Sequence, residues 1–79
     1  MPSTGAEVGY DVSEVGNSIA FQFSPKMKGK KVDIYVNDDY LLSATVGKKY
    51  EIKVSKSSGI GKEILKGIIG KKKIRVLSV

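Results

Sequence analysis

The sequence predicts a mainly β protein of the α+β kind: a small β-barrel of about six strands with one short helix near residues 60–69. Apolar and polar residues alternate over most of the chain, which is the period of half-buried strands. This period changes to a helical spacing only after Ser57-Ser58. With 79 residues the chain has room for one core, so a single domain is expected, with residues 1–5 as a loose tail.

The first strands are predicted on either side of a turn. Residues 7–12 alternate as a half-buried strand, and Gly16-Asn17 then interrupts the pattern with two residues that tolerate positive φ. The alternation resumes over residues 19–23. Pro25 ends this second strand because proline has no N–H to donate to a neighbouring strand.

A basic connection and a hairpin follow. The connection Lys26–Lys31 is too short for more than one helical turn. Residues 31–45 alternate on both sides of Asn37-Asp38-Asp39, a strong turn signal, and so predict a β-hairpin. Residues 46–49 predict another turn, and the alternation over residues 50–54 predicts a fifth strand.

The helix is predicted from five apolar residues on one helical face: Ile60, Ile64, Leu65, Ile68 and Ile69. Ser58 suits the N-cap, and Gly70 followed by lysines suits the C-terminal end. Gly61 and Gly67 each destabilise such a helix by about 1 kcal/mol relative to alanine, which argues against this prediction. Residues 73–79 are rich in β-branched side chains and predict the last strand.

Positive charge is concentrated in the second half of the chain. The net charge is +6, and residues 41–79 carry nine lysines and Arg75 against Glu51 and Glu63. Clustered cations gain free energy by releasing counterions from phosphates, so this half favours a polyanionic partner. A solvated lysine-rich surface, as in proteins from hot environments, is the alternative.

The composition argues against several classes of protein. There is no Cys and no His, so we expect no disulfide, no thiolate metal site and no catalytic base of the usual kind. We therefore predict no enzyme activity, no catalytic residue, no metal and no cofactor. No apolar run reaches the roughly 18–20 residues that span a bilayer, and the N-terminus lacks the layout of a signal peptide, so a cytoplasmic protein without membrane contact is expected.

Part of the chain repeats at a shift of 42 residues. Lys30-Lys31 then falls on Lys72-Lys73, Val32 on Ile74, and Ile34 on Val76. The matched segments are residues 12–36 and 54–77, although alternating strands in a lysine-rich chain also match by chance. A real repeat would let one chain build what a single half needs a dimer to build, so the protein is expected to be a monomer with an internal repeat or a homodimer.

Residues 12–36 carry a family resemblance. They contain a Gly16-Asn17-Ser18 turn, an apolar strand ending in Pro25-Lys26, and Gly29-Lys30-Lys31-Val32-Asp33-Ile34-Tyr35-Val36. This order resembles the swapped-hairpin DNA-binding domains of the AbrB/SpoVT/MazE class. The resemblance implies a small β-barrel, made from two interleaved copies, that binds DNA as a repressor or antitoxin. The short connector, the acidic Glu14 before the turn and the lack of an acidic tail depart from that pattern, and they speak against the antitoxin role.

The expected partner is double-stranded DNA, bound by a regulator or an architectural protein. Nine cations are the candidate contacts: Lys26, Lys28, Lys30, Lys31, Lys62, Lys71, Lys72, Lys73 and Arg75. The two lysine-rich loops among them are expected to straddle neighbouring phosphates. Only Arg75 can make a bidentate contact with a guanine edge, so binding should be mostly non-specific and should fall steeply with salt. The alternative is an interaction module that docks its basic face onto an acidic protein or an RNA-containing assembly.

Three smaller features have two interpretations each. The glycine-rich turn at residues 57–62 either binds a phosphate or simply caps the helix. Tyr35, on the polar face of its strand, is the best candidate for stacking an exposed base, whereas the other tyrosines share faces with apolar residues and are expected in the core. Asp38-Asp39 fits a turn better than a metal or acid/base site, because no third carboxylate or base is near in sequence.

Overall fold

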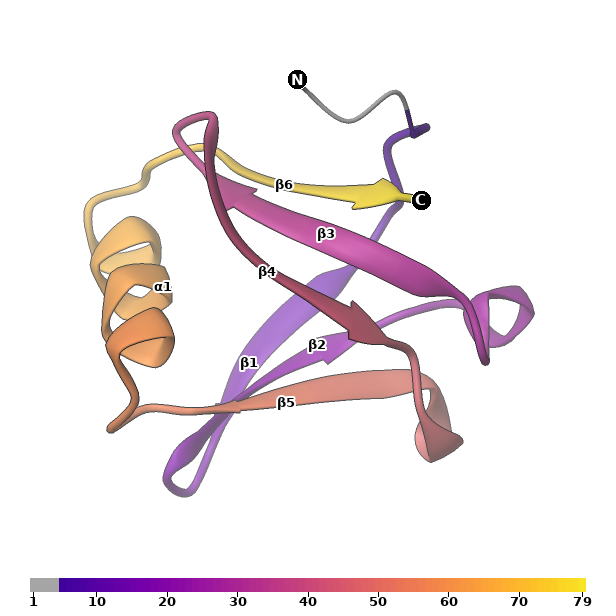
Figure 1. The fold of residues 1–79 in the computed structure, drawn as a ribbon. Coiled ribbons are helices and arrows are strands. Elements are labelled where there is room, and N and C mark those ends of the chain that lie inside the picture. The colour runs from indigo at the N-terminus through magenta and orange to yellow at the C-terminus, as the bar shows by residue number, and fades with distance from the viewer. Residues whose placement is uncertain (1–4) are drawn as a thin grey trace.

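The computed structural model describes residues 5–79, which form two antiparallel three-stranded sheets and one α-helix (Figure 1). The strands are β1 (Asp11–Val15), β2 (Ser18–Gln22), β3 (Lys31–Val36), β4 (Asp39–Thr45), β5 (Glu51–Ser55) and β6 (Ile74–Ser78); the helix is α1 (Gly59–Ile69). Two 3-10 turns, η1 (Pro25–Met27) and η2 (Lys48–Tyr50), join strands. The predicted mainly β class with six strands and one helix is confirmed. Most of the predicted N-terminal tail lies outside the described residues.

The strand orders are β1-β2-β5 in one sheet and β4-β3-β6 in the other. Both predicted hairpin turns are confirmed. The β1–β2 pair closes at Val15 and Ser18, with Gly16 at φ +58. The β3–β4 pair closes around Asn37 (φ 50) and Asp38 (φ 68), and positive φ at both central residues is what a type I′ hairpin turn requires.

The first strand differs from its predicted bounds. The expected inward side chains of residues 8, 10 and 12 do pack against the core, but the backbone pairs with β2 only from Asp11 onward. Before that point the chain pairs with β6: Val8 N donates to Val76 O at 2.8 Å, and Ser78 N donates to Ala6 O at 2.9 Å. Residues 6–15 therefore run from one sheet into the other.

The core fills the space between the two sheets. Ile19 and Phe21 of β2 and Val32 and Ile34 of β3 are fully buried. Val46, which the sequence assigned to a turn, is also buried, at 1% exposure. Its backbone explains this, because Val46 N donates to Lys30 O at 2.9 Å and continues the β3–β4 hairpin by one residue pair.

The helix begins as predicted and packs more closely than its sequence suggests. The Ser58 hydroxyl accepts a hydrogen bond from Gly61 N at 2.9 Å, so Ser58 is the N-cap. A Cβ at Gly61 would lie 1.9 Å from Ser55 O, and one at Gly67 would lie 3.1 Å from Val36 Cγ1. The two glycines that weakened the helix prediction thus let α1 approach β5 and β3.

The helix ends at Ile69, as predicted, and the left-handed residue comes one position after Gly70. Gly70 has φ −81, and the left-handed position belongs to Lys71, with φ 54. Lys71 N donates to Ile68 O at 3.3 Å, and Lys72 N donates to Gly67 O at 2.8 Å. These two hydrogen bonds form the Schellman pattern, with lysine at the position that glycine normally occupies.

The proposed repeat fits the structure only in its second part. A shift of 42 residues places β3 on β6, and these strands pair with Ile34 opposite Val76, the two residues that the shift equates. The same shift places β2 on the first turns of α1, so residues 12–36 and 54–77 differ in their elements. What recurs is the order strand, strand, helical segment, strand, as β1-β2-η1-β3 and as β4-β5-α1-β6, although η2 stands between β4 and β5.

No helix within residues 5–79 is long and apolar enough to cross a membrane.

Candidate nucleic-acid interface

The segments that join β2 to β3 and β4 to β5, which contain η1 and η2, both lie at the right side of Figure 1, and together they carry six lysines. Hydrogen bonds join these two segments: Gly29 N, after η1, donates to Val46 O, before η2, at 2.8 Å, and the Gln22 side chain at the end of β2 donates to Lys49 O in η2 at 2.7 Å. Pro25 starts η1, and Gly29 reverses the chain with φ +79. We call this group the lysine end; its members are Lys26, Lys28, Lys30, Lys31, Lys48 and Lys49.

The charges of the lysine end are exposed and unpaired. All six residues are exposed, and no ion pair within residues 5–79 involves any of them. The ion pairs that the described chain does form lie elsewhere: Lys53–Glu51, Lys56–Glu14, Lys66–Glu63, Arg75–Glu7 and Arg75–Asp38. The lysine end therefore presents the largest concentration of uncompensated positive charge in this part of the chain.

Lys48 and Lys49 were not among the residues predicted from the sequence. A signal for them existed in the predicted hairpin over residues 31–45. If Lys31 pairs with Thr45, as it does, then one further pair sets Lys30 against Val46 and brings the following lysines beside η1. The sequence prediction stopped the hairpin one pair too early.

Lys71, Lys72 and Lys73 lie at the opposite end of the molecule, after α1 (Figure 1). We call them the helix-end cluster. They are exposed, and the backbone of Lys73 is fixed by Asn37, whose N–H donates to Lys73 O at 2.9 Å. The length of β3 separates the two groups by about 17 Å, at about 3.3 Å per residue. The two basic loops therefore cannot straddle neighbouring phosphates, which was the expectation from the sequence.

The two other predicted cations belong to neither group. Arg75 Nη2 lies 3.0 Å from Glu7 Oε1, and Arg75 Nη1 lies 3.3 Å from Asp38 Oδ1, so two carboxylates occupy the guanidinium. Lys62 is exposed in the first turns of α1, about 13 Å along the helix axis from Lys71. Arg75 could read a base only after giving up these pairs.

Two tyrosines lie together on the outer face of the β4-β3-β6 sheet. The Tyr35 and Tyr40 rings meet edge to face with centroids 5.8 Å apart. The prediction that Tyr40 belongs to the core is wrong, because it is 55% exposed; Tyr10 and Tyr50 do pack against the core. The Tyr40 hydroxyl is bonded to the Ser43 hydroxyl at 2.8 Å, and Ser43 donates in turn to the Asp33 carboxylate, so this face is polar and partly acidic.

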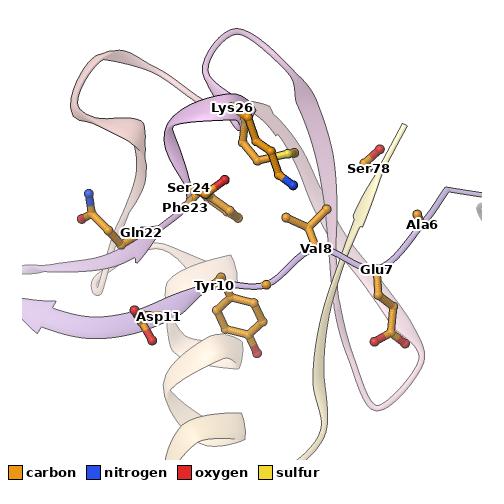
Figure 2. A pocket seen from close by; sticks show the side chains of 12 residues that line it. Ala6, Glu7, Val8, Tyr10, Asp11, Gln22, Phe23, Ser24, Lys26 and Ser78 are labelled. Carbon is orange, nitrogen blue, oxygen red and sulfur yellow. The ribbon is translucent and has the colours of Figure 1, made fainter.

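A pocket of about 680 Å³ lies between the N-terminal segment and η1 (Figure 2). Val8, Tyr10, Phe23 and Met27 give it apolar walls, and Figure 2 shows Lys26 extending over it. The Tyr10 hydroxyl donates to Ile74 O at 2.9 Å, and burial raises the pKa of this phenol. No group of three His, Cys, Asp or Glu side chains within residues 5–79 is placed to hold a metal ion.

The smaller motifs behave as local structure. The Gly61 N–H at the start of α1 is bonded to the Ser58 hydroxyl, so capping occupies one of the backbone donors that a phosphate would use. Asp38 and Asp39 stand at the β3–β4 turn, and Asp38 pairs with Arg75.

No protein-family model, no curated protein and no solved structure matches the chain. The resemblance of residues 12–36 to AbrB-class domains therefore stays a prediction. The function has to be argued from the geometry and charge of the chain itself.

Proposed function

We propose that this protein binds double-stranded DNA, without catalysing a reaction, by setting its lysine end against the phosphates. One observation carries the proposal: six exposed lysines from two turns lie together, and no ion pair within residues 5–79 neutralises them. A lysine ammonium is a mobile point charge that suits phosphate contact and reads no sequence. The role that follows is that of a non-specific architectural protein or a regulator.

The energetics of this site are those of counterion release. Six like charges on two short turns repel one another in the free protein, and phosphates remove this repulsion while their bound counterions are freed. If all six lysines contact phosphates, log K should fall with log salt with a slope of about −5. Affinity would then drop on the order of 10³ between 50 and 200 mM salt.

The framework proposed for this site is a small barrel formed by the two sheets together. Residues 6–8 join β6 to the chain that becomes β1, which supports closure on one side. On the other side the η2 turn joins β4 to β5, where Gly47 N donates to Glu51 O at 3.3 Å. One chain supplies all six strands in this arrangement, which favours a monomer over the interleaved dimer that the AbrB resemblance implies.

The test compares two double variants that lose the same charge. Lys48→Gln/Lys49→Gln removes two lysines of the lysine end, whereas Lys53→Gln/Lys56→Gln removes two that already form ion pairs. Binding to a mixed-sequence duplex is measured from about 50 to 200 mM salt. The first variant should bind more weakly, with a salt slope shallower by about 2; the second should stay close to the wild type.

The proposal fails if the wild type does not bind the duplex at about 50 mM salt, or if its binding does not weaken as salt rises. Equal effects of the two variants would show that total charge matters and the lysine end does not. Tighter binding to a duplex RNA of the same length would favour the RNA-containing assembly instead.

A further inference from the structure

Apart from Lys62 on α1, the lysines without an ion pair within residues 5–79 form two groups at opposite ends. Beyond the lysine end, the helix-end cluster Lys71–Lys73 is exposed, and no ion pair within residues 5–79 involves it. β3 and β6 run antiparallel between the two groups, so each strand begins near one group and ends near the other. The longest dimension of the molecule is 30 Å.

The charges between the two groups largely cancel one another. Arg75, on the outer face of β6, is held by Glu7 and Asp38, and the same face carries the Asp33 carboxylate. Lys56, beside the β1–β2 turn, is paired with Glu14 at 2.7 Å. A polyanion laid along the middle of the molecule would meet little net positive charge, so the two ends act as separate sites.

A straight duplex could reach both ends only by lying along the molecule, where its phosphates would also face the carboxylates of Asp33 and Asp38. A duplex that instead contacts the lysine end from outside leaves the helix-end cluster facing away from it. The free cluster is then available to a second duplex.

We propose that the protein bridges two DNA segments, holding one at the lysine end and the other at the helix-end cluster. The inference rests on the proposed function and adds a second site and a new activity to it. The helix-end site is the weaker of the two, because it has three lysines against six and Asp39 begins β4 directly after the neighbouring β3–β4 turn. The positions of these lysines are set by the Schellman end of α1 and by the pairing of Lys73 with Asn37.

A two-duplex capture assay tests the bridge. One mixed-sequence duplex is fixed to beads, a second is labelled and free, and capture of the label is measured with wild-type protein at about 50 mM salt. The triple variant Lys71→Gln/Lys72→Gln/Lys73→Gln should bind a single duplex within about threefold of the wild type, because the lysine end is intact. Its capture of the labelled duplex should fall by about tenfold or more.

A charge-matched control separates site from net charge. Lys53→Gln/Lys56→Gln/Lys66→Gln removes three lysines that are each ion-paired, and it should capture the second duplex as the wild type does. Thermal unfolding of all variants verifies that they are folded. A mixture of the helix-end variant and the lysine-end variant Lys48→Gln/Lys49→Gln should not restore capture to the wild-type level, because one chain must carry both intact sites.

The outcomes distinguish the two proposals. If the wild type binds one duplex but captures no second one, the bridge is wrong and the proposed DNA binding stands. The bridge is also wrong if the helix-end variant captures the labelled duplex as well as the wild type does, or if the matched control loses as much capture as that variant. Restored capture in the mixture would overturn it as well. If the wild type binds no duplex at all, both proposals fall.

Discussion

Two of the unpaired lysines occupy backbone positions that normally favour glycine. Lys49 has φ 61 and Lys71 has φ 54, and a non-glycine residue in this region costs roughly 1–2 kcal/mol. One belongs to the lysine end and the other to the helix-end cluster. Strain of this kind is often retained at functional sites, so the two positions are compatible with the proposed binding sites, although Asn37, Asp38 and Tyr50 also have positive φ.

Lys49→Gly should therefore raise the free energy of unfolding by about 1 kcal/mol while it weakens DNA binding. Lys48→Gly is the matched control, because it removes the same charge from a residue whose φ is not positive. The control should lose binding without gaining stability. Urea unfolding and duplex binding of both variants check this, and equal stability changes in the two would show that strain at Lys49 is absent.

Tyr10 links stability to alkaline pH. Its hydroxyl donates to Ile74 O at 2.9 Å, so Tyr10→Phe should lower the free energy of unfolding by about 1 kcal/mol near neutral pH. Burial raises the pKa of Tyr10 in the folded protein above that in the unfolded chain. The folded state thus holds this proton more tightly, and its contribution is full below about pH 10 and is lost as the pH rises through the folded pKa.

The measurement is the free energy of unfolding of both proteins between about pH 8 and pH 11, where the unfolded tyrosine pKa of about 10 lies. The lysines also titrate in this range, but they do so in both proteins. The difference between wild type and variant should shrink as the pH rises. A difference that stays constant would mean that the phenol does not change charge with unfolding.

At the scale of one element, α1 depends on glycines that would weaken an isolated helix. Gly61→Ala should destabilise the protein by about 1–3 kcal/mol, the usual cost of overpacking, although alanine favours helices. The reason is the 1.9 Å separation between the added Cβ and Ser55 O. Gly59→Ala is the control, because its Cβ would meet nothing within 4 Å and should stabilise the helix. Thermal unfolding compares the two; a stabilising Gly61→Ala would mean that α1 can move away from β5.

The elements that the sequence predicted well are those whose signal is local. Alternation placed the strands, Asn37 and Asp38 placed a hairpin turn, and Ser58 placed the start of α1. The errors depend on which segments become neighbours in space. The chain pairs with β6 before Asp11 and with β2 from Asp11 onward, and Gly61 is required by its close approach to Ser55. Neither feature leaves a pattern in the sequence.

The candidate site divides in the same way. The four lysines within residues 26–31 are close in sequence and could be found as a basic connection. Lys48 and Lys49 come close to them only in the folded protein, where the segments that carry η1 and η2 are joined by hydrogen bonds. Arg75 appeared to be a free base-reading residue because its partner Glu7 is 68 residues away. Charge counting finds the cations, but only the fold shows which of them are already neutralised.

At the scale of the whole molecule, the net charge is +6, and most cations without an ion pair within residues 5–79 lie at the two ends, while those between them are paired except for Lys62. In the unbound protein these charges lower the stability of the folded state, because the lysines of each end repel one another. The free protein should therefore be a less stable molecule at low salt than at moderate salt. DNA should reverse this order, because its binding is strongest when salt is low.

Two opposite trends in the unfolding temperature follow. For the free protein it should rise by several degrees between about 0.01 and 0.15 M salt, over which the screening length falls from about 30 to about 8 Å. The further rise caused by excess duplex DNA should be largest at the lowest salt, about 2.7 kcal/mol in unfolding free energy at a hundredfold excess over Kd, and should vanish as salt increases. Lys48→Gln/Lys49→Gln should reduce both effects, since one set of charges causes both. Two results together would mean that the lysine end does not supply the binding energy. They are an unfolding temperature of the free protein that does not change with salt, and a stabilisation by DNA that persists at high salt.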